Sequence, residues 1–128
     1  MAIMTGPQTV AIIEDDQTLS EMYRLKFTNS GFRVVSANNG ESGLQLVRES
    51  SPNIILLDLK MPIMTGDEML RRLRQEPWGS DVRVIILTNI SKDEAPSALR
   101  FLHVDRYIVK AHYTPTQVVE IVKEVLAS

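Results

Sequence analysis

Four short apolar runs in this sequence each lead directly into a polar side chain that could take part in phosphoryl chemistry. Glu14 and Asp15 follow the first run, Asp58 the second, Thr88 the third and Lys110 the fourth. If the runs are parallel strands of one sheet, their carboxyl ends share an edge, which is where open α/β sheets bind ligands. Carboxylates, a hydroxyl and one ammonium group in one crevice indicate a site for a divalent cation and a phosphoryl group.

Each of these residues also has an ordinary structural explanation. Acidic residues at a helix start, such as those at positions 14–16, accept backbone N–H bonds and suit the helix dipole. Asp58 could be a cap or turn residue, Thr88 is at home in any strand, and Lys110 could be a solvated surface charge. It is the shared position at the ends of strands that favours a common site.

Charge balance predicts the cation. If Glu14, Asp15 and Asp58 converge, neighbouring carboxylates about 4 Å apart repel by about 4 kcal/mol in a partly screened site. A hard dication with oxygen ligands relieves this repulsion, and Mg²⁺ together with Lys110 balances the three negative charges. We therefore expect Mg²⁺ as the cofactor.

Composition restricts the class of protein. The 128 residues predict one domain, at 9–128, preceded by a flexible N-terminal arm at 1–8. The chain has no cysteine, a net charge of -2 and no apolar run near the ~20 residues of a membrane helix. A basic excess typical of nucleic-acid binders is absent. We expect a cytoplasmic protein that binds neither nucleic acid nor membrane directly.

Apolar periodicity alternates between strand and helix types along the whole chain. Such alternation predicts an α/β fold, a doubly wound parallel sheet of five strands with five helices. Thr114, Pro115 and Gln117 form a helix start signal with a capping box, whereas Pro96 is tolerable only in the first turn of a weaker fourth helix from about residue 93. The expected strands are Thr9–Ile13, Arg33–Ala37, 53–57, 82–87 and 104–109.

The motifs and their spacing resemble the receiver domain of two-component response regulators, of which the chemotaxis regulator is the familiar example. The resemblance covers about residues 9–126 and rests on four segments, namely Ile-Ile-Glu-Asp-Asp at 12–16, Leu-Asp-Leu-Lys-Met-Pro-Ile-Met-Thr-Gly at 57–66, Ile-Leu-Thr at 86–88 and Tyr-Ile-Val-Lys at 107–110. It implies a flavodoxin-like sheet with strand order 2-1-3-4-5.

The resemblance also implies a role for each acidic residue and for one backbone group. Asp58 would be the phosphoacceptor, attacking the phosphohistidine of a partner kinase. Asp15 would bind Mg²⁺ directly and Glu14 mainly through a water, with Asp58 and the backbone carbonyl of Lys60 completing the protein ligands.

The remaining implied roles concern binding and switching. Lys110 would pair with one phosphoryl oxygen, and Thr88 would bind another after phosphorylation. Tyr107 would then turn inward, which changes the surface of the fourth and fifth helices. A small two-state element of this kind can be biased by a local change of charge.

Three positions depart from the usual family pattern. Ala111 replaces a proline that follows a cis bond, and we expect a trans bond because cis before alanine costs about 2.5–4 kcal/mol. Asn89 stands where a small residue is common and could restrict access to the phosphoryl group. Lys60 occupies a position thought to tune dephosphorylation.

The resulting function is a phosphorylation-activated signalling switch that catalyses only its own phosphorylation and dephosphorylation. Its partners would be a sensor histidine kinase or phosphotransfer protein and a downstream effector protein. The alternative is a pseudo-receiver that acts by phosphorylation-independent protein binding, with Ala111 and Asn89 as the reasons to consider it. A flavodoxin-like cofactor binder is set aside because three acidic residues replace the phosphate loop.

Two features outside the motifs have simpler interpretations. The third helix is expected to have a solvated face that carries Arg71, Arg72 and Arg74. We expect Trp78 to be a packing residue that is usable as a fluorescence reporter.

Overall fold

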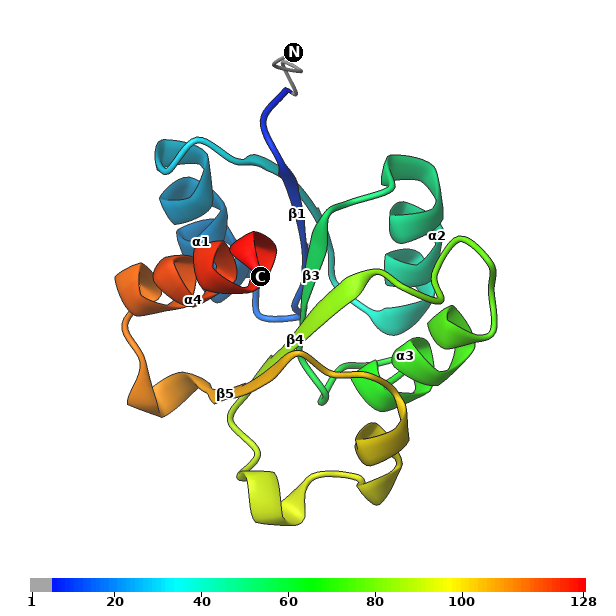
Figure 1. The fold of residues 1–128 in the computed structure, drawn as a ribbon. Helices are drawn as coiled ribbons and strands as arrows, with labels where there is room; N and C mark the ends of the chain where they lie inside the picture. The colour runs from blue at the N-terminus through cyan, green and yellow to red at the C-terminus, as the bar shows by residue number, and fades with distance from the viewer. Residues whose placement is uncertain (1–5) are drawn as a thin grey trace.

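A computed structural model describes residues 6–128, in which five parallel strands form one sheet in the order β2-β1-β3-β4-β5 (Figure 1). This is the predicted flavodoxin-like order. The strands are β1 (Thr9–Ile13), β2 (Arg33–Ala37), β3 (Ile54–Leu57), β4 (Arg83–Thr88) and β5 (Arg106–Val109). The α-helices are α1 (Gln17–Asn29), α2 (Gly40–Ser50), α3 (Gly66–Arg74) and α4 (Pro115–Ala127).

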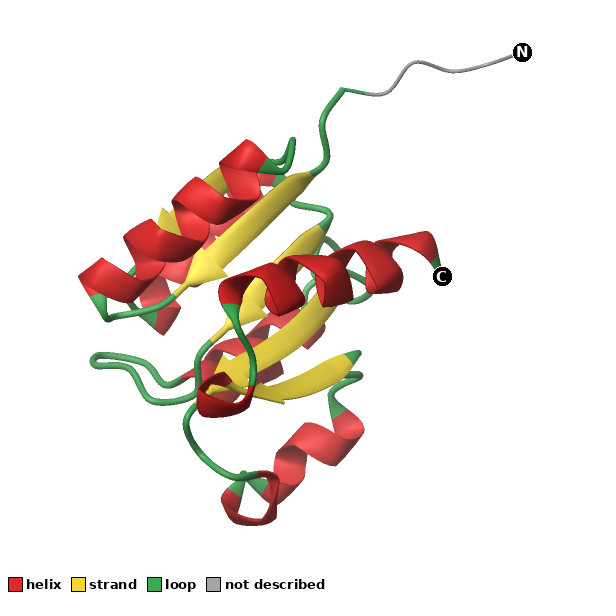
Figure 2. Cartoon of the chain, turned by 90° about the vertical axis from the view of Figure 1, so that its left-hand side faces the viewer, coloured by secondary structure: helices red, strands yellow, loops and turns green. Residues whose placement is uncertain are grey.

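The sheet lies between two layers of helices. Helices α1 and α4 pack on one face and α2 and α3 on the other (Figures 1 and 2). Strands β1 and β3 are buried along their whole length, because side chains on both sides of these strands meet a helical layer. The continuous apolar runs of the sequence are explained by this burial.

Local signals in the sequence set several helix ends. The Asp16 side chain accepts the Leu19 N–H at 3.0 Å and so caps α1. Gly31 follows the end of α1 with φ +96°, a conformation that glycine adopts without strain. Thr114 and Gln117 form the predicted capping box, with Pro115 as the first residue of α4.

The expectation of five α-helices is wrong, because the segment after β4 forms two short 3₁₀ helices instead of the fourth. These are η1 (Lys92–Glu94) and η2 (Ser97–Phe101), and a third 3₁₀ turn, η3 (Lys110–His112), follows β5. Pro96 has no N–H and forces Ala95 into an extended conformation, with ψ 149°, so the helix cannot run through. The remaining stretches are too short for a stable α-helix.

Strand β5 is also shorter than the expected 104–109. The Asp105 carboxylate accepts the Val84 N–H at 2.9 Å, so a side chain takes the place of a backbone partner at that point of the ladder. Of the predicted arm at 1–8, residues 1–5 lie outside the described residues, and residues 6–8 have no regular secondary structure. None of the helices described in residues 6–128 has the length and apolarity needed to cross a membrane.

Candidate functional site

Three acidic side chains meet at the carboxyl edge of the sheet. Glu14 and Asp15 follow β1, and Asp58 follows the neighbouring strand β3. One carboxylate oxygen from each lies within 4.8 Å of the others. Glu14 and Asp58 are buried, whereas Asp15 is exposed to solvent. The predicted convergence of these acids is therefore present.

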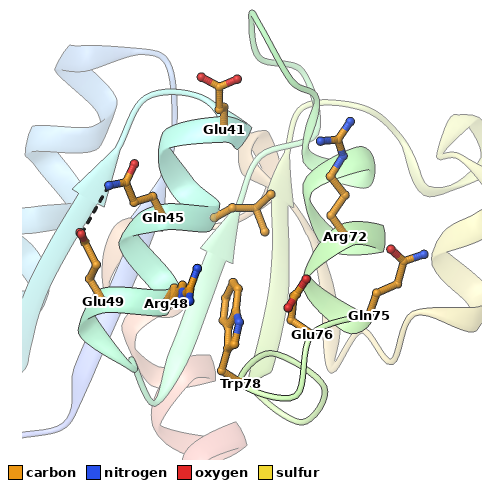
Figure 3. Close-up of a pocket in the computed structure, with 9 residues that line it drawn as sticks. Glu41, Gln45, Arg48, Glu49, Arg72, Gln75, Glu76 and Trp78 are labelled. Carbon is orange, nitrogen blue, oxygen red and sulfur yellow. Dashed lines mark hydrogen bonds between the residues drawn. The ribbon is translucent and has the colours of Figure 1, made fainter.

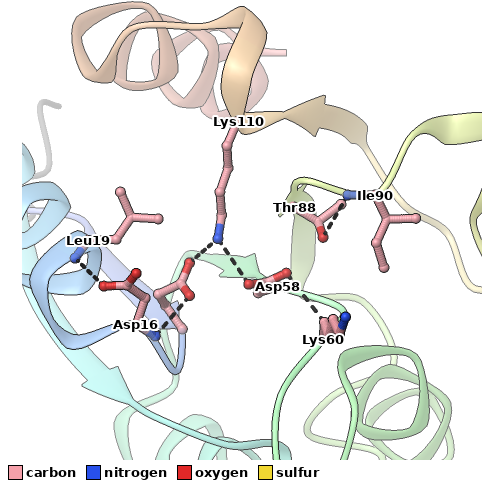
Figure 4. Close-up of polar contacts among 8 residues, drawn as sticks. Asp16, Leu19, Asp58, Lys60, Thr88, Ile90 and Lys110 are labelled. Carbon is pink, nitrogen blue, oxygen red and sulfur yellow. Dashed lines mark hydrogen bonds and ion pairs between the residues drawn. The ribbon is translucent and has the colours of Figure 1, made fainter.

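Lys110 lies between the two buried acids. Its ammonium Nζ is 2.5 Å from Glu14 Oε1 and 2.9 Å from Asp58 Oδ2 (Figure 4). The side chain reaches them from the end of β5, across the sheet edge, and is itself only 9% exposed. Hydrogen-bonded ion pairs in such a buried position are stronger than surface pairs, because little water screens them.

Burial and neighbouring charges change the proton affinity of this pair. Burial raises the pKa of Glu14 from 4.5 to about 7, although the hydrogen bonds from Lys110 and from the Asp16 N–H oppose the rise. Burial alone would lower the pKa of Lys110, but its hydrogen bonds to Glu14 and Asp58 raise it overall. Lys110 is therefore a permanent cation at this edge at neutral pH.

The three acids of the 14–16 segment have different tasks. Asp16 is the helix cap, as its ordinary explanation predicted, and its own N–H donates to Glu14 Oε2 at 3.1 Å. Glu14 thus has one oxygen held by Lys110 and the other by the backbone. Asp15 makes no hydrogen bond among the described residues, so its carboxylate is available to a ligand.

The donor set fits a hard divalent cation. Glu14, Asp15 and Asp58 offer only carboxylate oxygens, the ligand type that Mg²⁺ prefers. The Lys60 N–H lies 3.4 Å from Asp58 Oδ1, so this peptide segment is next to the carboxylate while the Lys60 side chain is exposed. These residues could hold Mg²⁺ and would leave positions for water.

The loop at 59–65 is closed tightly around the phosphoacceptor candidate. The Gly66 N–H donates to the Leu59 carbonyl at 2.9 Å, and a Cβ on Gly66 would lie 2.0 Å from the Asp58 carbonyl oxygen. Only glycine fits there, which accounts for the glycine at the end of the motif. The described residues contain no cis peptide bond, as expected for Ala111.

The two predicted switch residues meet at one peptide segment. Thr88 is buried at the end of β4, and its hydroxyl oxygen accepts the Ile90 N–H at 3.4 Å (Figure 4). The Tyr107 hydroxyl donates to the Ile90 carbonyl at 2.6 Å. Ile90 was not predicted from the sequence, because its backbone groups make both contacts. Asn89 lies between these positions and is exposed.

The prediction of a solvated arginine face is wrong for Arg74. Arg71 and Arg72 are exposed and pair with Glu68, but Arg74 is half-buried. Its guanidinium donates to carbonyls on both sides of it, those of Gly79, Ser80, Val82, Leu102 and His103. It therefore joins the end of α3 to the segments before β4 and β5.

A groove lies away from the acidic cluster, between α2 and α3. It encloses about 910 Å³. Trp78 forms one wall, and the Arg48 guanidinium carbon lies 5.9 Å from its ring centroid (Figure 3). Trp78 remains 37% exposed, so the predicted packing role is only partly fulfilled.

Comparison with known proteins identifies the family. Residues 10–123 match the response regulator receiver domain. The transcriptional regulatory protein AfsQ1 of Streptomyces coelicolor is 35% identical over 103 residues, which cover 80% of this chain and 44% of that protein. This chain spans about half the length or less of the transcriptional regulators that it matches, for example 52% of the PhoB protein of Pseudomonas aeruginosa and 19% of a regulator from Haloferax volcanii.

Solved structures agree with this match. A response regulator from Chloroflexus aurantiacus superposes with a TM-score of 0.85 at 30% identity, over 95% of this chain and 99% of that one. The phosphorylated cyanobacterial phytochrome response regulator RcpA superposes with a TM-score of 0.79 at 25% identity, over 94% and 91% of the two chains. The chain therefore belongs to the response regulator receiver domain family of two-component signalling.

Proposed function

We propose that the chain is a phosphorylation-activated switch in which Asp58 accepts a phosphoryl group from a histidine kinase or phosphotransfer protein. The observation that carries this proposal is the position of Lys110 Nζ between the buried carboxylates of Glu14 and Asp58, with Asp15 beside them. Such a site combines one cation with three oxygen donors at an exposed sheet edge. The phosphorylated state of the similar regulator RcpA supports the same chemistry here.

The reaction is an in-line transfer. An Asp58 carboxylate oxygen forms a bond to phosphorus as the bond from phosphorus to the histidine nitrogen of the donor breaks, and that nitrogen keeps the electron pair. The product is an acyl phosphate on Asp58 and, with one proton taken up by the ring from solvent, a neutral imidazole on the donor. Because little covalent chemistry is left to the protein, its contribution is positioning and neutralisation of charge.

Lys110 would supply the fixed positive charge for this transfer. Its ammonium already lies 2.9 Å from Asp58 Oδ2, so a phosphoryl oxygen attached there comes within its reach. Bound Mg²⁺ supplies a further positive charge that stabilises the phosphoryl oxygens. Glu14, Asp15, Asp58 and the Lys60 carbonyl would hold it.

The switch would start at Thr88. Its 3.4 Å contact with the Ile90 N–H is long for a hydrogen bond, so a charged phosphoryl oxygen can compete for the hydroxyl. When Thr88 moves, the peptide at Ile90 loses one of its two side-chain contacts. Tyr107, which holds the other, would turn inward and change the surface around η2 and β5 that an effector protein recognises.

The test is the intact mass of the chain after incubation with acetyl phosphate or phosphoramidate, with and without Mg²⁺. We expect a Mg²⁺-dependent gain of one phosphoryl group in the wild type and none in Asp58→Asn, which keeps the shape of the side chain but lacks the nucleophilic carboxylate. A folded wild type that gains no mass and binds no beryllofluoride would contradict the proposal.

The alternative of a phosphorylation-independent pseudo-receiver has no support. Such proteins usually lack one acid or the lysine, whereas this chain brings Glu14, Asp15, Asp58 and Lys110 together. Asn89 and Lys60 are both exposed beside the site, so their role would be to tune the lifetime of the acyl phosphate.

A further inference from the structure

Gly40 contacts the loop at 59–65 from a different part of the fold. It is the first residue of α2, and its N–H donates to the Met64 carbonyl at 3.0 Å. N–H groups in the first turn of a helix have no partner within the helix. Here the start of α2 finds its partner in the loop that follows Asp58.

This hydrogen bond is the loop's link to a distant element. In residues 6–128, the other hydrogen bonds of residues 59–65 stay within the loop or go to Asp58 and α3. Leu59 and Met61 bury their side chains in the core and so anchor the first half of the loop. In the second half Ile63 is exposed, and Met64 is held by the Gly40 N–H and by partial burial against the core.

The contact leaves no room for a side chain. A Cβ on Gly40 would lie 2.7 Å from the Met64 carbonyl oxygen and 2.9 Å from Met64 Cβ. The nearest of these atoms belongs to the backbone, so it cannot move aside without moving the loop. Any larger residue at this position must separate the start of α2 from the loop.

We infer that Gly40 is a positioning residue for the cation site, because it fixes the loop whose Lys60 carbonyl would bind Mg²⁺ beside Asp58. The inference rests on the proposed function. Residues that orient metal ligands without touching the metal commonly change its affinity by about 10–100-fold when they are replaced. We expect Gly40→Ala to raise the dissociation constant for Mg²⁺ by at least about tenfold.

Gly43→Ala is a matched control in the same helix. A Cβ on Gly43 would lie 2.9 Å from Met69 Sδ and 3.0 Å from Ile13 Cγ2, so it is also crowded. Its nearest neighbours are side-chain atoms of α3 and β1, not atoms of the loop at 59–65. Both variants add one methyl group at a tight helix position, but only Gly40→Ala presses on the loop.

The experiment is a calorimetric titration of Mg²⁺ into the full chain and the two variants, with circular dichroism to confirm folding. The inference predicts weaker binding in Gly40→Ala and an affinity close to wild type in Gly43→Ala. Equal affinities in wild type and Gly40→Ala, or an equal loss in both variants, would overturn it.

A measurement on the wild type covers the case in which Gly40→Ala does not fold. The Gly40 amide should exchange slowly with solvent, and its NMR resonance should shift when Mg²⁺ binds by more than that of Gly43. Fast exchange, or no shift at saturating Mg²⁺, would contradict the inference.

The same titration separates the two proposals. If the wild type binds no Mg²⁺, the proposed function and the role of Gly40 both fail. If the wild type binds Mg²⁺ and forms the acyl phosphate while Gly40→Ala binds the ion equally well, the proposed function stands and the role of Gly40 is refuted.

Discussion

At the scale of single residues, two acids of the site are held by hydrogen bonds within the protein and the third is not. Glu14 is fixed by Lys110 and by the Asp16 N–H, and Asp58 is fixed by Lys110 and approached by the Lys60 N–H. Asp15 is exposed and makes no such bond among the described residues. The fold therefore orients the two buried carboxylates and leaves the third exposed, where it could bind the proposed cation.

The first prediction concerns Glu14 and pH. Because its pKa is raised from 4.5 to about 7, the folded protein keeps a proton on Glu14 that the unfolded chain releases. The Glu14 contribution to the free energy of unfolding must then fall as pH rises from about 4.5 to above 7, by at most about 3 kcal/mol. Urea unfolding across this range, in Mg²⁺-free buffer, measures the effect.

Glu14→Gln provides the control, because glutamine keeps the shape of the side chain and does not titrate. The difference in unfolding free energy between wild type and variant should decrease with pH. Lys110 adds no slope in this range, since its pKa is raised above an already high ordinary value. A pH-independent difference would show that Glu14 is not perturbed by burial.

The sequence predicted those residues of the site that contribute through their side chains. Four of them, Glu14, Asp15, Asp58 and Lys110, follow an apolar strand, and Thr88 is the last residue of one. Parallel strands bring these carboxyl ends together. Ile90 could not be found in this way. Its contribution comes from N–H and carbonyl groups that every residue except proline has.

At the scale of elements, the sheet was predicted better than the segment between β4 and β5. The strand order and capping signals agree with the structure because buried apolar runs and caps are local features. The fourth helix was wrong because Pro96 lies far enough into the segment to divide it. Leu99 is the buried residue of this divided segment, and Ala95 and Leu102 pack against the core only partly buried.

The second prediction concerns Arg74, which ties elements together. Arg74→Lys should lower the free energy of unfolding by about 2–4 kcal/mol, because one ammonium group cannot reach the carbonyls that the guanidinium bonds on both sides. Chemical denaturation of the purified chain measures this loss.

Arg71→Lys, on the same helix, is the matched control. Arg71 is exposed and pairs only with Glu68, so the substitution should change the free energy of unfolding by less than about 0.5 kcal/mol. Similar losses in the two variants would mean that Arg74 has no special structural role. The sequence did not reveal this role because the acceptors lie in loops whose course follows from the whole fold.

At the scale of the whole molecule, the two edges of the sheet carry different features. The acids, Lys110 and the switch residues gather at the carboxyl edge. The loop between α3 and β4, which contains Trp78, leads into the amino end of β4 at the opposite edge. The groove beside Trp78 lies between α2 and α3 (Figure 3). None of the residues that line it belongs to the acidic cluster.

The third prediction uses Trp78, the single tryptophan of the chain. Its emission should shift when the protein unfolds, since the ring leaves the wall of the groove and the neighbouring Arg48. It should not change when Mg²⁺ binds or Asp58 is phosphorylated. A fluorescence change on phosphorylation without unfolding would show that the structural change extends from the carboxyl edge to the Trp78 groove.

Finally, the contact of both Thr88 and Tyr107 with Ile90 has a consequence for the response to a stimulus of intermediate strength. Thr88 and Tyr107 bind the N–H and the carbonyl of the same residue, so a movement of Ile90 that breaks one contact would also displace the other. Under the proposed switch, each molecule would then be in one of two conditions, off or on. A stimulus of intermediate strength would therefore change the fraction of molecules in the active state. The graded response of the population would be the sum over molecules that are each fully inactive or fully active.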